Sequence, residues 1–100
     1  YKIWSLIDKM ILKISKINKS ISDLEGWIFK NNTITKEYTF EKYMDSIEFI
    51  NKIAIEAEEL NHHPDINLGY CRIIVSFTSH DEGGVTKKCI TMAKNLENII

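Results

Sequence analysis

The chain has 100 residues, of which 44% are hydrophobic and 27% charged, and its formal net charge is −1. This length predicts one domain, residues 1–100, with a single modest core. The near-zero charge provides neither the basic excess of a direct nucleic-acid binder nor the acidic excess of a solvating tail. No apolar run approaches the ~20 residues of a membrane-spanning helix, and no secretory signal is visible.

The chain contains two cysteines, Cys71 and Cys89, which are too few for a disulfide scaffold. Their neighbours are apolar, so we expect buried free thiols in a reducing compartment and therefore a cytoplasmic protein. Because the chain begins with Tyr1 rather than Met, we also expect an N-terminal extension, which could carry a targeting segment.

The first predicted element is a helix over residues 3–21. Apolar residues recur three and four positions apart while lysines fill the opposite face, which favours a helix packed on a sheet over a membrane-surface or partner-binding helix. These apolar residues are Ile3, Leu6, Ile7, Met10, Ile11, Ile14, Ile17 and Ile21. Gly26 is expected to end this segment. A hairpin then follows, with a turn at Asn31-Asn32 between an extended stretch at 27–29 and a strand at 33–39.

A second helix is predicted over residues 41–60, with Thr39 as its N-cap. Its apolar stripe is wider than one sheet contact needs, so we expect part of it to pack against another subunit. The stripe consists of Met44, Ile47, Ile50, Ala54 and Ala57, widened by Tyr43, Phe49, Ile53 and Leu60. Asn61 suits a left-handed helix terminus, and Pro64 makes His63 leave the helix.

A strand is predicted over residues 70–80, because Cys71, Ile73, Val75 and Phe77 would point to one face and Arg72, Ile74, Ser76, Thr78 and His80 to the other. A short strand at 66–69 precedes it, a turn at 81–84 follows it, and Thr86 begins a last helix. The order helix, strand, strand, helix, strand, strand, helix predicts an α+β fold. We expect a four-stranded antiparallel sheet with three helices packed on one face.

All three histidines of the chain lie at the ends of predicted elements. Histidine can give and take a proton near neutral pH. Taken singly, each has a simpler explanation: His62 and His63 could satisfy carbonyls at the helix end, and His80 could pair with Asp81. Taken together, with Pro64 fixing the backbone beside two of them, they indicate a small proton-transfer site.

Two other kinds of site use the same residue types. Three histidines with Cys or Asp could ligate zinc, but successive side chains diverge in an extended chain and no H-x-x-x-H or C-x-x-C spacing is present. A nucleophilic pair of Cys89 with a histidine is chemically feasible, although no motif supports it. Gly83-Gly84 is typical of a turn rather than of a phosphate-binding loop.

The spacing of the histidines resembles the signature of the pterin-4a-carbinolamine dehydratases. Glu58, His62-His63-Pro64, Tyr70 and His80 are separated by three, five and nine residues. The resemblance extends from about Leu24 to the C-terminus. It is supported by Gly26-Trp27, the helix after Phe40, the stretch Thr78-Ser79-His80-Asp81, and Gly84-Val85-Thr86.

The resemblance implies dehydration of 4a-hydroxytetrahydropterin to the quinonoid dihydropterin, which recycles the tetrahydrobiopterin cofactor of aromatic amino acid hydroxylases. The C4a hydroxyl leaves as water only when protonated, and N5 loses its proton as the C=N bond forms, so neither a metal nor a cofactor is expected. By resemblance, His63 and His80 are the general acid/base groups, and His62 binds the pterin and orients the hydroxyl. The implied substrate-binding residues are Glu58, Asn61, Thr78, Ser79 and Asp81.

The chain departs from the family pattern at Cys89, which aligns with an Asp at the start of the last helix. If that Asp tunes or orients a histidine, we expect reduced activity or a shifted pH optimum here. The region between Trp27 and Ile34 is also shorter, as in a trimmed hairpin. A straight strand places Tyr70 about 33 Å from His80, so we expect Tyr70 to pack structurally or to serve another subunit.

The resemblance also implies a homotetramer built as a pair of dimers. Some members of the family act as dimerisation cofactors for a homeodomain transcription factor. A non-enzymatic binding module for such a partner, located also in the nucleus, is therefore the alternative function. A pterin is the expected small-molecule partner, and neither direct nucleic-acid binding nor a membrane is expected.

Overall fold

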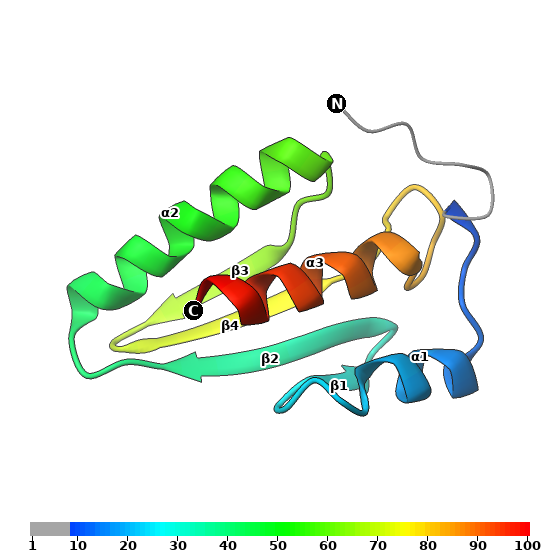
Figure 1. The fold of residues 1–100 in the computed structure, drawn as a ribbon, viewed down its shortest axis with the longest axis horizontal. Helices are drawn as coiled ribbons and strands as arrows, with labels where there is room; N and C mark the ends of the chain where they lie inside the picture. The colour runs from blue at the N-terminus through cyan, green and yellow to red at the C-terminus, as the bar shows by residue number, and fades with distance from the viewer. Residues whose placement is uncertain (1–8) are drawn as a thin grey trace.

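The structure, a computed structural model, describes residues 9–100. Its elements are α1 (Ile14–Ile21), β1 (Ile28–Lys30), β2 (Thr33–Thr39), α2 (Tyr43–Leu60), β3 (Asp65–Gly69), β4 (Arg72–Phe77) and α3 (Lys87–Ile99). Neighbouring strands are antiparallel, in the order β1-β2-β4-β3. The three helices lie against one face of this sheet (Figure 1). The predicted α+β fold and its element order are therefore confirmed.

Both β-hairpins turn at residues with a left-handed backbone. Asn31 and Asn32, with φ of 51° and 60°, connect β1 to β2 as predicted, and the short Asn side chain tolerates this conformation. Cys71, with φ of 54°, makes the turn from β3 to β4 together with Tyr70. The predicted strand 70–80 is therefore wrong at both ends, because residues 70–71 form this turn and β4 ends at Phe77.

The two cysteines are both free thiols, but they differ in burial. Cys89 is completely buried, as predicted. Cys71 is only partly buried, so the prediction of a buried thiol is wrong there. Its position in a tight turn at the end of the sheet explains the difference, because turns lie at the surface.

The second helix presents a different face to the sheet from the predicted one. Its buried residues are Ser46, Phe49, Ile53, Ala57 and Leu60. Met44 is 63% exposed and Ala54 is exposed, so the predicted stripe is wrong at these positions. The helix follows Lys42 as N-cap, whereas Thr39, the predicted cap, is the last residue of β2. Apolar residues cover more than one side of this helix, so packing decides which side is buried.

The first helix is shorter than the sequence predicts. Part of the predicted span, residues 3–8, lies outside the described residues, and residues 9–13 are not α-helical. Ile11 instead forms an isolated bridge with Thr86, and the N–H of Leu12 donates to the carbonyl of Val85 at 2.8 Å. These backbone groups are satisfied by the segment before α3, so they do not enter a helix.

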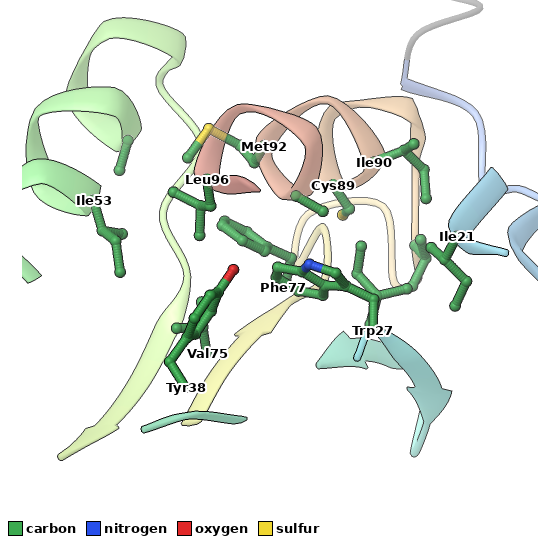
Figure 2. Packing of buried hydrophobic residues seen from close by; sticks show 14 of the residues in the cluster. Ile21, Trp27, Tyr38, Ile53, Val75, Phe77, Cys89, Ile90, Met92 and Leu96 are labelled. Atoms are coloured by element: carbon green, nitrogen blue, oxygen red, sulfur yellow. The ribbon is translucent and has the colours of Figure 1, made fainter. Parts of the chain in front are cut away.

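The core lies between the sheet and the helices. Cys89, Met92 and Leu96 of α3 belong to the same buried cluster as Phe77 of β4 (Figure 2). No helix within residues 9–100 has the length and apolar character that spanning a membrane requires.

A carboxylate near the C-terminal end of α3 ties this helix to the sheet. Oε2 of Glu97 accepts hydrogen bonds from Nε1 of Trp27 at 3.1 Å, Nζ of Lys36 at 2.8 Å and the hydroxyl of Tyr38 at 2.6 Å. One donor precedes β1 and the other two belong to β2, so these hydrogen bonds hold α3 in place over the sheet. The same helix carries Cys89 near its other end.

Candidate active site

The end of α2 places the first histidine against the core. Asn61 is the left-handed C-cap of α2, with φ of 50°, as predicted. The chain turns there, and the N–H of His62 donates to the carbonyl of Ala57 at 3.0 Å. His62 is 8% exposed, and its ring stacks on that of Phe77, with centroids 5.9 Å apart. Its Nε2 lies 3.2 Å from Sγ of Cys89.

This environment keeps His62 uncharged. Burial lowers the pKa of His62 to about 4, with a further contribution from the positive charge of Lys88 and smaller ones from His63 and His80. Removing an imidazolium from water costs free energy, and the nearby cation adds repulsion. His62 is therefore a neutral imidazole at pH 7.

The second histidine, His63, is exposed. Nε2 of His63 lies 2.5 Å from Oε2 of Glu58, in the last turns of α2. Pro64 follows His63, and the chain leaves the helix there as predicted. The carboxylate orients the imidazole and leaves its other nitrogen available to a substrate.

The third histidine comes from the loop between β4 and α3. Nε2 of His80 lies 3.6 Å from Oδ2 of Asp65, the first residue of β3. The sequence suggested the adjacent Asp81 as a partner for His80, but the carboxylate near its ring is that of Asp65. The loop is closed tightly, because the carbonyl of Ser79 accepts hydrogen bonds from the N–H groups of Gly83 at 2.7 Å and Glu82 at 3.1 Å.

These segments enclose one pocket of about 460 Å³. Its lining includes every residue predicted from the sequence except Glu58, which reaches the site through His63. Those lining residues are Asn61, His62, His63, Thr78, Ser79, His80 and Asp81. Lys9, Glu82 and Lys88 also line the pocket but were not predicted. Two of them, Lys88 and Glu82, are sequence neighbours of Cys89 and Asp81, and this adjacency is the signal that could have indicated them.

A cluster of buried polar side chains lies behind His62. Oγ of Ser79 and Oγ1 of Thr86 are 2.6 Å apart, and Sγ of Cys89 lies 3.7 Å from the first and 3.9 Å from the second. Thr86 is the N-cap residue of α3, as predicted, but its hydroxyl bonds to this cluster instead of to the helix backbone. Burial raises the pKa of the Cys89 thiol, although hydrogen bonds from Thr86 and Ser79 oppose the shift.

Neither a nucleophilic cysteine nor a metal site matches the geometry of the described residues. Cys89 does contact a histidine, but a completely buried sulfur that stays protonated is poorly suited to nucleophilic attack. Within residues 9–100, no group of three or more His, Cys, Asp or Glu side chains is arranged to hold a metal ion. The pocket instead combines one buried neutral imidazole, that of His62, with the exposed imidazoles of His63 and His80, and such groups are suited to proton transfer.

Tyr70 takes no part in this pocket. It lies at the opposite end of β4, in the β3–β4 turn, and is 83% exposed. Its ring stacks on that of Tyr43, with centroids 6.2 Å apart and planes 10° from parallel. Within this chain its contact is therefore structural.

The chain is similar to known proteins over most of its length. Residues 10–99 match the family model described as Pterin 4 alpha carbinolamine dehydratase. A protein from Sulfolobus acidocaldarius is 37% identical over 90 residues, which cover 90% of this chain and 99% of that protein. One from Metallosphaera sedula is 38% identical over 88 residues, which cover 88% and 92%. Both are provisionally named as pterin-4-alpha-carbinolamine dehydratases.

Solved structures show the same relationship. A crystal structure of a transcriptional coactivator/pterin dehydratase from Brucella melitensis has a TM-score of 0.84 and 32% identity, over 89% of this chain and 97% of that one. A pterin dehydratase-like protein identified as a RuBisCO assembly factor in the alpha-carboxysome shares only the fold. It has a TM-score of 0.64 and 19% identity, over 76% of this chain and 90% of that one. The family match over residues 10–99, together with relatives above 30% identity, shows that this chain belongs to the pterin 4 alpha carbinolamine dehydratase family.

Proposed function

We propose that this protein dehydrates a 4a-hydroxytetrahydropterin to the quinonoid dihydropterin by histidine acid/base catalysis, as in tetrahydrobiopterin recycling. One observation carries the proposal: His62, His63 and His80 come from two separate segments and line a single pocket. Membership of the dehydratase family supports the reaction class. The pocket volume of about 460 Å³ lies within the usual range for small-molecule sites.

The reaction requires two proton movements. A proton goes to the C4a hydroxyl oxygen, the C4a–O bond breaks, and water leaves. N5 then releases its proton as its electron pair completes the C=N bond, so the pterin has lost one water in total. His63 and His80 are the acid/base groups in this proposal, since each is exposed and has a carboxylate nearby: Glu58 is hydrogen-bonded to His63, and Asp65 lies 3.6 Å from His80.

His62 has a binding role in the proposal. It is neutral and fixed between Phe77 and Cys89, so it cannot rotate freely to accept and return protons. A fixed neutral imidazole can hold the substrate in one orientation, which lowers the entropic part of the barrier. Asn61, Thr78, Ser79 and Asp81 surround the same space and would contact the pterin ring.

The test is the rate of dehydration of freshly generated 4a-hydroxytetrahydropterin, followed by ultraviolet absorbance. We expect wild-type protein to accelerate it and the His63→Ala/His80→Ala double variant to lose about 100-fold or more, the usual contribution of general acid–base groups. Glu59→Ala, an exposed change beside Glu58, is the matched control and should retain full activity. No acceleration by well-folded wild type would overturn the proposal.

A second candidate function is a binding module for a protein partner, such as a transcription factor. The Brucella melitensis relative is described as both a coactivator and a dehydratase. On this chain, α2 exposes Tyr43, Met44 and Ile55, at 42%, 63% and 66%. Such apolar residues on one helix suit a protein contact. We propose that further copies of the chain cover these residues in a homotetramer. Binding of a different protein to the catalytically inactive double variant would instead favour the binding-module function.

A further inference from the structure

We propose that Cys89 is a positioning residue that sets the tautomer of His62. Its thiol donates its hydrogen to Nε2, so the ring hydrogen is on Nδ1 and His62 presents an N–H donor to the pocket. This inference deepens the proposed function and rests on it for its catalytic meaning. The tautomer itself can be measured without substrate.

The contact is short and buried on both sides. Sγ of Cys89 lies 3.2 Å from Nε2 of His62. Cys89 has no exposed surface and His62 is 8% exposed. The ring cannot easily turn away, because it stacks on Phe77 with planes 15° from parallel. Sγ of Cys89 and Nε2 of His62 therefore keep a fixed position relative to each other, with one hydrogen between them.

All hydrogens of the cluster find an acceptor when the thiol donates to Nε2. Ser79 and Thr86 each bring one hydroxyl hydrogen, and one of the two occupies the 2.6 Å contact between their oxygens. The other can point to Sγ of Cys89, which lies 3.7 Å from one oxygen and 3.9 Å from the other. The sulfur then accepts from a hydroxyl, and its own hydrogen is left for Nε2 of His62.

The opposite direction makes poorer hydrogen bonds. If Nε2 carried the hydrogen, it would donate to sulfur, which is a weak acceptor. Both hydroxyl hydrogens could still find acceptors in the cluster, but the thiol hydrogen would have to reach a hydroxyl oxygen at 3.7 or 3.9 Å. Nε2 of His62 is a nearer acceptor for that hydrogen, at 3.2 Å, so the first arrangement is favoured.

Neither His62 nor Cys89 changes its protonation state near pH 7, so the tautomer assignment holds there. His62 is neutral there, because burial lowers its pKa to about 4, and burial keeps Cys89 as a thiol. The neighbouring charged and titratable groups are Lys88 on α3, His63 after α2, and His80, Asp81, Glu82 and Lys9 around the pocket. A neutral imidazole has one N–H, so donation by the thiol decides which nitrogen carries it.

The consequence for the reaction is a division of roles. His62 lines the pocket and its Nε2 is engaged by Cys89, so Nδ1–H is the ring group left to donate a hydrogen bond to an oxygen of the pterin, and His62 does not act as a base. Removal of the N5 proton then depends on His63 or His80. A carboxylate at position 89 would accept a hydrogen from Nε2 instead, and Nδ1 would become an acceptor.

The test is a two-bond ¹H–¹⁵N NMR spectrum of ¹⁵N-labelled protein at pH 7 without substrate. Protonated and bare ring nitrogens resonate far apart, and with three histidines in the chain the His63→Ala and His80→Ala variants assign every signal. We expect wild-type His62 to show a protonated Nδ1 and a bare Nε2. Cys89→Asp should reverse the pattern, and Cys71→Ser, a change at the other cysteine, should leave it unaltered.

A wild-type spectrum with Nε2 protonated would overturn the proposal. If Cys89→Asp fails to fold, Cys89→Ala is the second variant. Without the thiol donor, His62 should no longer be restricted to the tautomer with an unprotonated Nε2. In active protein, Cys89→Asp should move the acid limb of the kcat/KM profile to higher pH; an unchanged profile would defeat the catalytic role. An Nδ1–H wild type without dehydratase activity would instead remove the proposed function and leave the tautomer assignment standing.

Discussion

Nε2 of His63 lies 2.5 Å from Oε2 of Glu58, although the two residues lie on either side of the end of α2. The left-handed backbone of Asn61 makes this contact possible by folding the chain back over the last helical turn. In this way a helix terminus produces an oriented imidazole. The contact is exposed, so it serves orientation more than stability.

Glu58→Gln should therefore reduce catalysis without unfolding the protein. The imidazole of His63 would lose its ionic partner and its fixed orientation, and we expect kcat/KM to fall about 10-fold, equivalent to roughly 1.4 kcal/mol of transition-state stabilisation. The melting temperature should barely change. Glu59→Gln, the adjacent exposed carboxylate, is the control. Equal activity of the two variants would show that the Glu58 contact has no catalytic importance.

The buried His62 should make folding stability depend on pH. Its folded pKa of about 4 lies below the ordinary value of 6.5, so between these values the unfolded chain binds more protons than the folded one. Stability is then lost as pH falls from 6.5 towards 4, by at most about 3 kcal/mol. Urea unfolding at several pH values should show this slope in wild type and a flatter one in His62→Gln. Parallel slopes would contradict it.

Glu97 should contribute to stability with its own pH dependence. Burial alone would raise its pKa, but hydrogen bonds from Lys36, Tyr38 and Trp27 outweigh it, so the pKa lies below the ordinary 4.5. This stabilisation is present above 4.5 and is lost as pH falls through the folded pKa. We expect Glu97→Gln to lose about 1–3 kcal/mol at pH 7.

The measurement for Glu97 is chemical unfolding of wild type and Glu97→Gln at pH 7 and at acidic pH, where their stabilities should converge. Glu48→Gln makes the same change at an exposed carboxylate of α2 and is the control; it should leave stability nearly unaltered. A constant difference between wild type and Glu97→Gln at all pH values would mean that the amide disturbs packing and that the charge of Glu97 contributes nothing.

The exposed apolar residues of α2 should mediate self-association. Ile55 is 66% exposed, and replacing it with Glu would put a charge into any interface formed there. We expect light scattering to show a tetramer for wild type at micromolar concentration and smaller species for Ile55→Glu. Ile14→Glu, on α1 and 62% exposed in the wild type, should leave the mass unchanged. A monomeric wild type would refute the tetramer.

Local sequence determined much of this protein. The asparagine turn at residues 31–32, the left-handed Asn61 and the break at Pro64 are each decided within a few residues, because backbone conformation there depends on the side chain present. The order of helices and strands follows from hydrophobic periodicity, which is also local. The spaced histidines were predicted from the sequence to form a site, and all three line one pocket; their roles in catalysis and binding stay predictions.

Tertiary structure decided what depends on contacts between distant segments. The buried side of α2, the start of α1 and the pairing of His80 with Asp65 are set by packing and by competition for backbone partners. The same holds for His62, whose contact with Cys89 joins residues 27 positions apart. Periodicity shows that a residue can be buried, but only the assembled core determines which neighbour it meets, and that neighbour sets its protonation and its chemistry.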